Sequence, residues 1–323
     1  MSVAARGVRV LVTGGAGFLG SHVVTALTGH PDVKLVVAGD VRPPEHPVED
    51  VLYEECDVTG PAGLAALLER HDIDVVVHLA AIVSPDRDHD LEYRVDVDGT
   101  RQVLDACVEA GVRRVVVSSS GAAYGYHPDN PEWLRESDPV RGNEEFPYAK
   151  HKRLVEQMLA GARVTHPALE QVVFRIGTIL GPSVQNQITA LWDGPALLAV
   201  RGSDSPFVFV WVDDVAAAMV RAATDGPPGI YNVAGDGRLT IHDIARRLGK
   251  PVITVPAALI GFGLRIGRML RLTVHGPEQV GFLRYRPVLA NEALKTRFGF
   301  TPAMTSAEAF EEYLRTHPGV ARR

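Results

Sequence analysis

The sequence predicts an α/β protein whose core is a doubly wound parallel sheet, followed by a smaller C-terminal substrate lobe. One observation is a set of short apolar runs rich in valine, which suit strands buried on both faces of a parallel sheet: Val8–Val12, Leu35–Ala38, Val75–Leu79, Val115–Ser118 and Val172–Ile176. Another is that helical patterns separate these runs, at Leu19–Leu27, Pro61–Arg70, Leu91–Ala110 and Tyr148–Leu159. Such alternation predicts helices on both faces of one sheet and a ligand site at the carboxyl ends of its strands.

The rhythm of the sequence changes after Gly181-Pro182. A section punctuated by glycine and proline follows, and helical patterns then appear near 213–223, 241–248 and 305–315. We therefore expect residues 1–180 to form the sheet domain and residues 181–323 to form a mixed α/β lobe. Interleaving of segments between the two is left open, because no linker separates them.

The amino-acid composition excludes some classes of function. The 323 residues are 46% hydrophobic and 22% charged, with a formal net charge of −6, which gives no electrostatic case for binding nucleic acid. The two cysteines, Cys56 and Cys107, have no metal-ligand spacing, which indicates a reduced, cytoplasmic setting and no metal site. The N-terminus runs straight into the first strand and shows no signal-peptide core.

One apolar stretch, residues 252–274, requires a test for membrane affinity. Pro256 and three arginines (Arg265, Arg268 and Arg271) interrupt it, so it does not predict a membrane span. The arginines recur at three-residue spacing and would share one face of an amphipathic helix. A helix covering the substrate lobe is the simplest interpretation, with a lid or a membrane-surface contact as alternatives.

The strongest local signal is the segment Val10-Leu-Val-Thr-Gly-Gly-Ala-Gly-Phe-Leu-Gly20, which holds Gly14, Gly17 and Gly20 between a strand and a helix. A tight turn of this kind lets the backbone approach a pyrophosphate, which rests on the N-terminus of the helix. The pattern predicts a dinucleotide site in a Rossmann-type sheet. A glycine-rich turn without this function would not need an apolar strand before it and a helix after it.

Acidic residues follow the next two strands. Asp40 ends the second strand, at the spacing expected for a carboxylate that accepts hydrogen bonds from the adenine ribose. A carboxylate there repels a 2′-phosphate, so NAD is favoured over NADP, although Arg42 lies close by. Asp57 is positioned either to bind the adenine amino group or to serve only as a turn residue.

Tyr148 and Lys152 stand four residues apart, which places both side chains on one helix face. A phenol is a poor base at neutral pH because its pKa lies near 10, and a neighbouring ammonium favours the phenolate. Alone, this spacing occurs by chance on many surface helices. Its combination, in order, with the glycine turn, Asp40 and a strand that ends in Ser118–Ser120 predicts an oxidoreductase site.

These motifs together resemble the extended short-chain dehydrogenase/reductase family, which includes NAD-dependent nucleotide-sugar epimerases and dehydratases. The resemblance covers nearly the whole chain. It rests on the motifs Thr13-Gly-Gly-Ala-Gly-Phe-Leu-Gly20, His78-Leu-Ala-Ala81, Val117-Ser-Ser-Ser-Gly-Ala-Ala-Tyr-Gly125, Tyr148-Ala-Lys-His-Lys152, Phe174-Arg-Ile-Gly-Thr-Ile-Leu-Gly-Pro182, Trp211-Val-Asp-Asp-Val-Ala216 and Ile230-Tyr-Asn-Val-Ala234.

The resemblance implies roles for individual residues. Ser120 would orient the substrate oxygen, Tyr148 would be the acid/base, and Lys152 would tune Tyr148 and hold the nicotinamide ribose. The implied NAD site comprises Gly14, Gly17, Phe18, Leu19, Gly20, Asp40, Arg42, Asp57, Val58, Leu79, Ala80, Ala81, Ser118, Tyr148 and Lys152. The candidate substrate contacts are Ser84, Ser119, Ser120, Thr178, Arg201 and Phe207.

Departures from the family pattern reduce the number of reactions that the chain is expected to catalyse. Gly121 and Ala122 stand where 4,6-dehydratases carry an Asp-Glu pair, which argues against dehydration. Thr178 stands where sugar epimerases commonly have an asparagine, and Phe207 where they commonly have an arginine. A positive charge to bind the substrate diphosphate would therefore have to come from Arg201, Arg284 or Arg286. Asp96 stands where the family often has asparagine.

Three functions remain open. The first is a nucleotide-sugar epimerase, and the second is a dehydrogenase or reductase of a less charged substrate, as in the hydroxysteroid-type branches. The third is a dinucleotide sensor without catalysis. The family also implies a homodimer, formed through helices near 91–110 and 148–160. A small molecule is the expected substrate in each catalytic case.

Overall fold

A seven-stranded parallel sheet forms the centre of the computed structural model, which describes residues 7–82, 88–184, 186–204, 206–270, 273 and 276–321. The strand order is β10-β6-β5-β4-β1-β2-β3. The bounds are β1 Val8–Thr13, β2 Val33–Asp40, β3 Val51–Glu55, β4 Val75–His78, β5 Arg114–Ser120, β6 Glu170–Ile176 and β10 Gly229–Val233. All five predicted strands are present, and the predicted fold class is confirmed. The order reverses between β1 and β4, which is where such sheets bind ligands.

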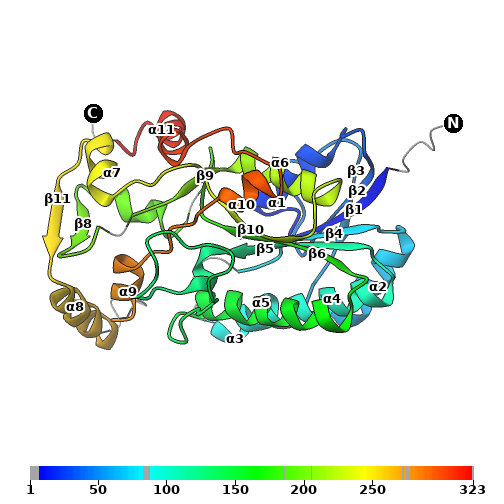
Figure 1. Cartoon of the computed structure of the whole chain (residues 1–323), viewed down its shortest axis with the longest axis horizontal. Coiled ribbons are helices and arrows are strands. Elements are labelled where there is room, and N and C mark those ends of the chain that lie inside the picture. Colours follow the sequence, from blue (N-terminus) through cyan, green and yellow to red (C-terminus); the bar gives the residue numbers. More distant parts are fainter. Residues whose placement is uncertain are drawn as a thin grey trace.

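Helices cover both faces of the sheet (Figure 1). On one face, α1 (Phe18–Leu27) and α6 (Val212–Ala223) pack their apolar residues against the strands. On the other face lie α2 (Pro61–Arg70), α4 (Gly99–Glu109) and α5 (Pro147–Thr165). The valine-rich runs are therefore buried from both sides, as their lack of polar alternation predicted.

The continuous helix predicted for Leu91–Ala110 is interrupted. It consists of α3 (His89–Tyr93), the π-helical turn η1 (Arg94–Asp98) and then α4. Within the π turn, a buried Asp96 carboxylate accepts a hydrogen bond from the Ile82 amide at 2.8 Å. The wider turn directs this carboxylate toward the loop after β4, a local bond that apolar periodicity does not reveal.

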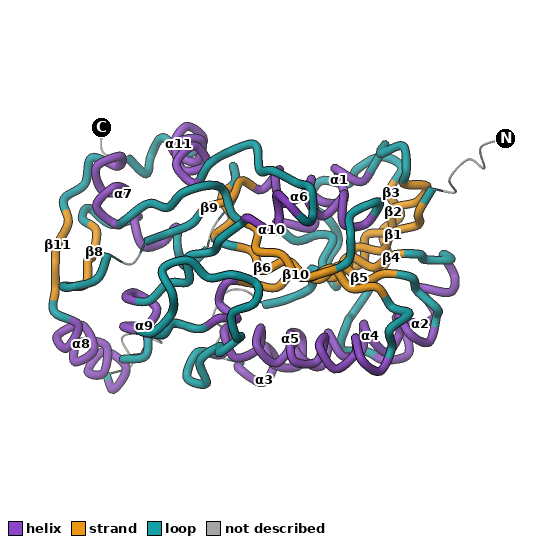
Figure 2. The backbone as a smooth tube through the Cα atoms, viewed as in Figure 1, coloured by secondary structure: helices purple, strands orange, loops and turns teal. Residues whose placement is uncertain are grey.

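The second lobe lies at the opposite end of the molecule from β3 (Figure 2). Two small parallel sheets, β7–β9 and β8–β11, surround an aromatic core that includes Trp192, Phe209 and Phe310. Its strands and helical turns are β7 Thr178–Leu180, β8 Leu197–Val200, β9 Phe209–Trp211, β11 Val252–Val255 and η3 Thr189–Trp192. Its helices are α7 Ile241–Leu248, α8 Ala257–Met269, α9 Gln279–Arg284 and α11 Ser306–Thr316. Helix α10 (Glu292–Thr296) packs instead on β10 of the main sheet. The division at 180/181 stays a prediction, since α6 and β10 return to the main sheet.

The stretch 252–274 begins as strand β11 and becomes helix α8 after Pro256. Leu259, Phe262 and Met269 are exposed on this helix, so its apolar residues do not all face the lobe. Arg271 lies outside the described residues. Within the described ranges, no helix is long and apolar enough to cross a membrane.

Candidate active site

The glycine turn connects β1 to α1 and leaves its backbone open. Gly14 has φ +73°, in the left-handed region that favours glycine, and a Cβ there would lie 2.8 Å from the Ala80 nitrogen. A Cβ on Gly20 would lie 2.0 Å from the Gly14 oxygen. Gly17 is the N-cap of α1 and provides no side-chain cap. Free amides at a helix N-terminus fit the pyrophosphate of a dinucleotide, so the residues present suit NAD.

Asp40 lies at the end of β2, beside this turn. Its carboxylate accepts hydrogen bonds from the amides of Ala16 and Arg42, each at 3.1 Å. Arg42 is exposed. Asp57 instead accepts from the amide and hydroxyl of Thr59, at 2.8 and 2.7 Å. Asp40 is therefore bonded to the glycine turn itself, whereas Asp57 stabilises a turn of its own after β3.

One cavity of about 500 Å³ begins at the glycine turn and reaches the second lobe. The predicted residues that line it are Gly14, Gly17, Phe18, Leu19, Gly20, Leu79, Ala81, Ser118, Ser119, Ser120, Tyr148, Lys152, Thr178 and Phe207. Val58 and Ala80 pack instead within the apolar layer on the α2, α4 and α5 side of the sheet. Arg201 is exposed, and its amide bonds to the Val255 oxygen. Ser84 lies outside the described residues.

The candidate catalytic groups come from β5 and α5. Pro147 occupies the first turn of α5, so the helix begins just before Tyr148. The Lys152 ammonium donates to the Ser118 carbonyl oxygen at 2.9 Å and lies 5.6 Å from the centre of the Tyr148 ring. The Ser120 hydroxyl oxygen accepts from the Ala122 amide at 3.1 Å and caps the short turn η2 (Gly121–Tyr124). The sequence-predicted trio is thus gathered around one cavity.

Ser119 points elsewhere. Its hydroxyl donates to the Glu156 carboxylate at 2.6 Å, and the residue is only 2% exposed. Although Ser119 belongs to the cavity wall, this bond occupies its hydroxyl proton. A direct role toward a substrate, as predicted, would require breaking it.

The far end of the cavity is aromatic, which the sequence did not reveal. Tyr126, Phe146 and Phe282 all line it, with ring centres 5.2 to 5.8 Å apart. The Arg286 guanidinium lies 4.0 Å from the centre of the Phe207 ring and 5.0 Å from that of Phe282. Burial lowers the pKa of Arg286 to about 9. Of the three arginines considered from sequence, only Arg286 is among the described residues lining this cavity.

His78 lies behind the cofactor edge of the sheet, at the end of β4. Its ring nitrogens bond the hydroxyls of Thr13 at 2.8 Å and Thr100 at 3.0 Å. Burial, followed by the charge of Lys152, lowers the pKa of His78 to about 4. The imidazole is therefore neutral at physiological pH and serves as a hydrogen-bonded spacer between β1 and α4.

Residues 10–234 match the NAD dependent epimerase/dehydratase family. The chain belongs to this family. It is therefore an NAD-dependent enzyme rather than a non-catalytic dinucleotide sensor.

Individual relatives agree with this class. An uncharacterized protein of Mycobacterium tuberculosis is 28% identical over 320 residues, covering 95% of this chain and 83% of its own. The UDP-glucose 4-epimerase of Azospirillum brasilense is 37% identical over 185 residues, which span 54% of this chain and 49% of that protein. The structure of Thermus thermophilus UDP-glucose 4-epimerase with NAD matches with a TM-score of 0.75 and 26% identity, covering 96% and 99% of the two chains.

Proposed function

We propose that this enzyme interconverts epimers of a nucleotide-linked sugar by oxidising a secondary alcohol and returning the hydride to the opposite face. The observation that carries the proposal is the extent of the cavity, which joins the glycine turn, Tyr148 and Lys152 to the cation Arg286. A substrate with a sugar at one end and an anionic group further along fits this order. Two relatives named above are UDP-glucose 4-epimerases, which supports the same class.

The chain's own groups have distinct tasks in this proposal. Tyr148 takes the proton of the substrate hydroxyl, while Ser120 donates a hydrogen bond to the same oxygen. Lys152, held by the Ser118 carbonyl, keeps a positive charge beside the phenol. NAD, when bound along the glycine turn, supplies the hydride acceptor. The same groups return the proton after the ketone intermediate has rotated to present its opposite face.

Arg286 provides the anion-binding part of the site. Although burial lowers its pKa to about 9, the guanidinium remains protonated at neutral pH. Its position against Phe207 and Phe282 fixes the planar group, and a guanidinium recognises phosphate oxygens in pairs. The substitution of Phe207 for the family's usual arginine is thereby compensated from another segment.

The test is to incubate the enzyme and NAD with UDP-glucose or UDP-galactose and follow both sugars by NMR. We expect isomerisation without net change in NADH absorbance. Arg286→Met should raise KM by about 10-fold to 100-fold, because a charge-assisted contact is lost. Arg284→Met is the matched control, since Arg284 packs on Tyr285 and is not one of the cavity-lining residues.

A second candidate is a net reductase of a less charged ketone. The aromatic group Tyr126, Phe146 and Phe282 favours an apolar substrate body. Stoichiometric NADH consumption with simple ketones, and no isomerisation of UDP-sugars, would replace the epimerase proposal with this one.

We also infer a cytoplasmic homodimer built from α4 and α5. On these helices Val108 is 38% and Val164 82% exposed, an apolar surface that a second copy would cover. Both cysteines are free and buried, which suits a reducing compartment. Sedimentation of the enzyme tests the dimer, and Val164→Asp should shift it toward monomer.

A further inference from the structure

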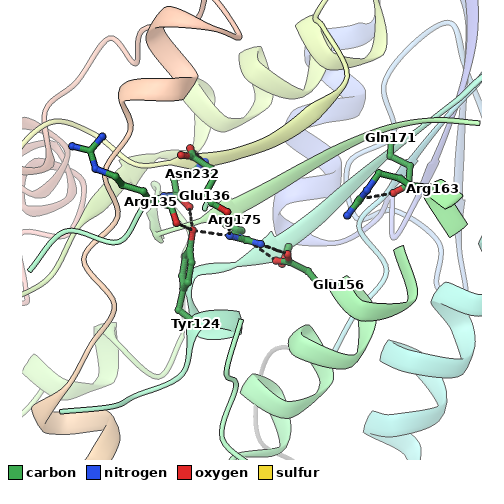
Figure 3. Close-up of polar contacts among 9 residues, drawn as sticks. Tyr124, Arg135, Glu136, Glu156, Arg163, Gln171, Arg175 and Asn232 are labelled. Carbon is green, nitrogen blue, oxygen red and sulfur yellow. Dashed lines mark hydrogen bonds and ion pairs between the residues drawn. The ribbon is translucent and has the colours of Figure 1, made fainter. Parts of the chain in front are cut away.

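Glu156 of α5 and Arg175 of β6 form a buried ion pair (Figure 3). The Arg175 guanidinium donates to both oxygens of Glu156, at 2.6 to 3.0 Å. The two side chains are 5% and 4% exposed. The same carboxylate accepts the Ser119 hydroxyl at 2.6 Å. Glu156 thus links α5, β5 and β6 in one place.

Glu156 and Lys152 attach α5 to β5 at two neighbouring points. They stand four residues apart and so lie on one face of α5. Lys152 donates to the Ser118 carbonyl oxygen, and Glu156 accepts from the hydroxyl of the next residue, Ser119. Ser120 follows at once in the chain. The two bonds therefore fix the helix that carries Tyr148 relative to the strand that carries Ser120.

Arg175 extends this connection to the segment after Ser120. It pairs with Ser119 in the β5–β6 register and donates to the Tyr124 hydroxyl oxygen at 2.8 Å. Tyr124 closes η2 and donates in turn to Asn232 of β10 at 2.8 Å. Burial opposes the charge, yet hydrogen bonds and charge from Glu156 hold the pKa of Arg175 above its ordinary value. The guanidinium is therefore a permanent cation at the base of the site.

We infer that Glu156 and Arg175 are positioning residues, which act through Ser119 and Tyr124 to set the spacing between Ser120 and the Tyr148–Lys152 pair. The inference rests on the roles proposed above for Ser120, Tyr148 and Lys152. Stability alone does not require the ion pair, because apolar residues of similar volume often replace such pairs without loss. An apolar pair, however, could not hold Ser119 and Tyr124 through hydrogen bonds. It could therefore not fix the positions of the reacting groups.

The test compares double variants that leave no unpaired charge. Glu156→Met with Arg175→Met should remain folded with wild-type NAD affinity, but lower kcat about 10-fold to 100-fold with little change in KM. Glu156→Gln with Arg175→Met restores an acceptor for Ser119 and should recover part of kcat. Ser119→Ala, which leaves the ion pair intact, should lower kcat in the same direction.

The matched control is the other ion pair on these strands. Arg114 and Glu170 pair at 2.7 Å in the same β5–β6 register, at the end of the strands far from Ser120. Arg114→Met with Glu170→Gln should change stability but not kcat. An equal loss of kcat in this control, or wild-type kcat in a folded Glu156→Met/Arg175→Met enzyme, would overturn the inference. If that variant does not fold, wild-type kcat in Ser119→Ala overturns it instead.

A readout without turnover separates this inference from the proposed reaction. The ionisation midpoint of the Tyr148 phenol can be followed by ultraviolet difference absorbance, each variant being compared with its Tyr148→Phe counterpart. The midpoint should move in the Glu156/Arg175 variants and stay fixed in the Arg114/Glu170 control. A shift with no activity on any UDP-sugar would refute the substrate and keep the positioning role. An unmoved midpoint would refute the positioning role.

Discussion

Lys152 is anchored to the backbone of Ser118, not to its side chain, through a hydrogen bond of 2.9 Å to the carbonyl oxygen. The ammonium is consequently held at the strand edge whatever side chain residue 118 carries. It lies 5.6 Å from the centre of the Tyr148 ring.

Asp40 should decide the choice of cofactor. Asp40→Asn keeps the shape of the side chain but removes the charge that repels a 2′-phosphate. We expect NADH affinity to fall about 10-fold and NADPH affinity to rise, because charge-assisted bonds to the ribose are lost. Fluorescence titration with both nucleotides measures this. Asp57→Asn is the control, and an unchanged preference in Asp40→Asn would contradict the role of Asp40.

Gly20 should tolerate no side chain. The Cβ of Gly20→Ala would lie 2.0 Å from the Gly14 oxygen, so the turn must move and NAD binding should be lost. In contrast, Gly63→Ala in α2 meets nothing within 4 Å and should stabilise the protein by up to about 1 kcal/mol. Calorimetric titration with NAD distinguishes the two variants. Wild-type NAD affinity in Gly20→Ala would refute the proposed path of the pyrophosphate.

The two thiols should be unreactive in the folded protein. Burial raises the pKa of Cys56 to about 11 and that of Cys107 to about 12, from 9.0. At mildly alkaline pH the thiolate fraction of each falls by a factor of about 100 or more. A thiol-specific chromogenic reagent should therefore label neither cysteine until denaturant is added. Rapid labelling of the native enzyme would show that the loop holding Cys56, or helix α4 with Cys107, opens more readily than its packing implies.

His78 should make the fold sensitive to acid. Its folded pKa is lowered to about 4 from 6.5, so the unfolded chain binds the proton first as pH falls. The stability from a neutral His78 is complete above pH 6.5 and is lost progressively between about 6.5 and 4, with about 2 kcal/mol gone at about pH 5. Urea unfolding at several pH values measures this slope. His78→Gln should flatten it, whereas exposed His46→Gln should not, and equal slopes would contradict the assignment.

The sequence predicted the sheet well, and it proposed candidate reacting groups, because both inferences use local patterns. Valine runs defined the strands, and the glycine turn, Asp40, Tyr148 and Lys152 each follow a short spacing rule. Arg286 could not be selected over Arg201, since the fold of the C-terminal lobe, and no local motif, brings it to Phe207. The Glu156–Arg175 pair was missed for the same reason, because its partners lie on separate elements.

The most direct test of the central claim is the turnover of Tyr148→Phe, measured together with its NAD affinity. The substitution removes one phenolic oxygen and no packing volume of consequence. Turnover should fall about 100-fold to 10,000-fold, because proton transfer at the substrate oxygen loses its donor and acceptor, while NAD affinity stays within about 3-fold of wild type. Turnover at the wild-type rate would contradict the assignment of this site.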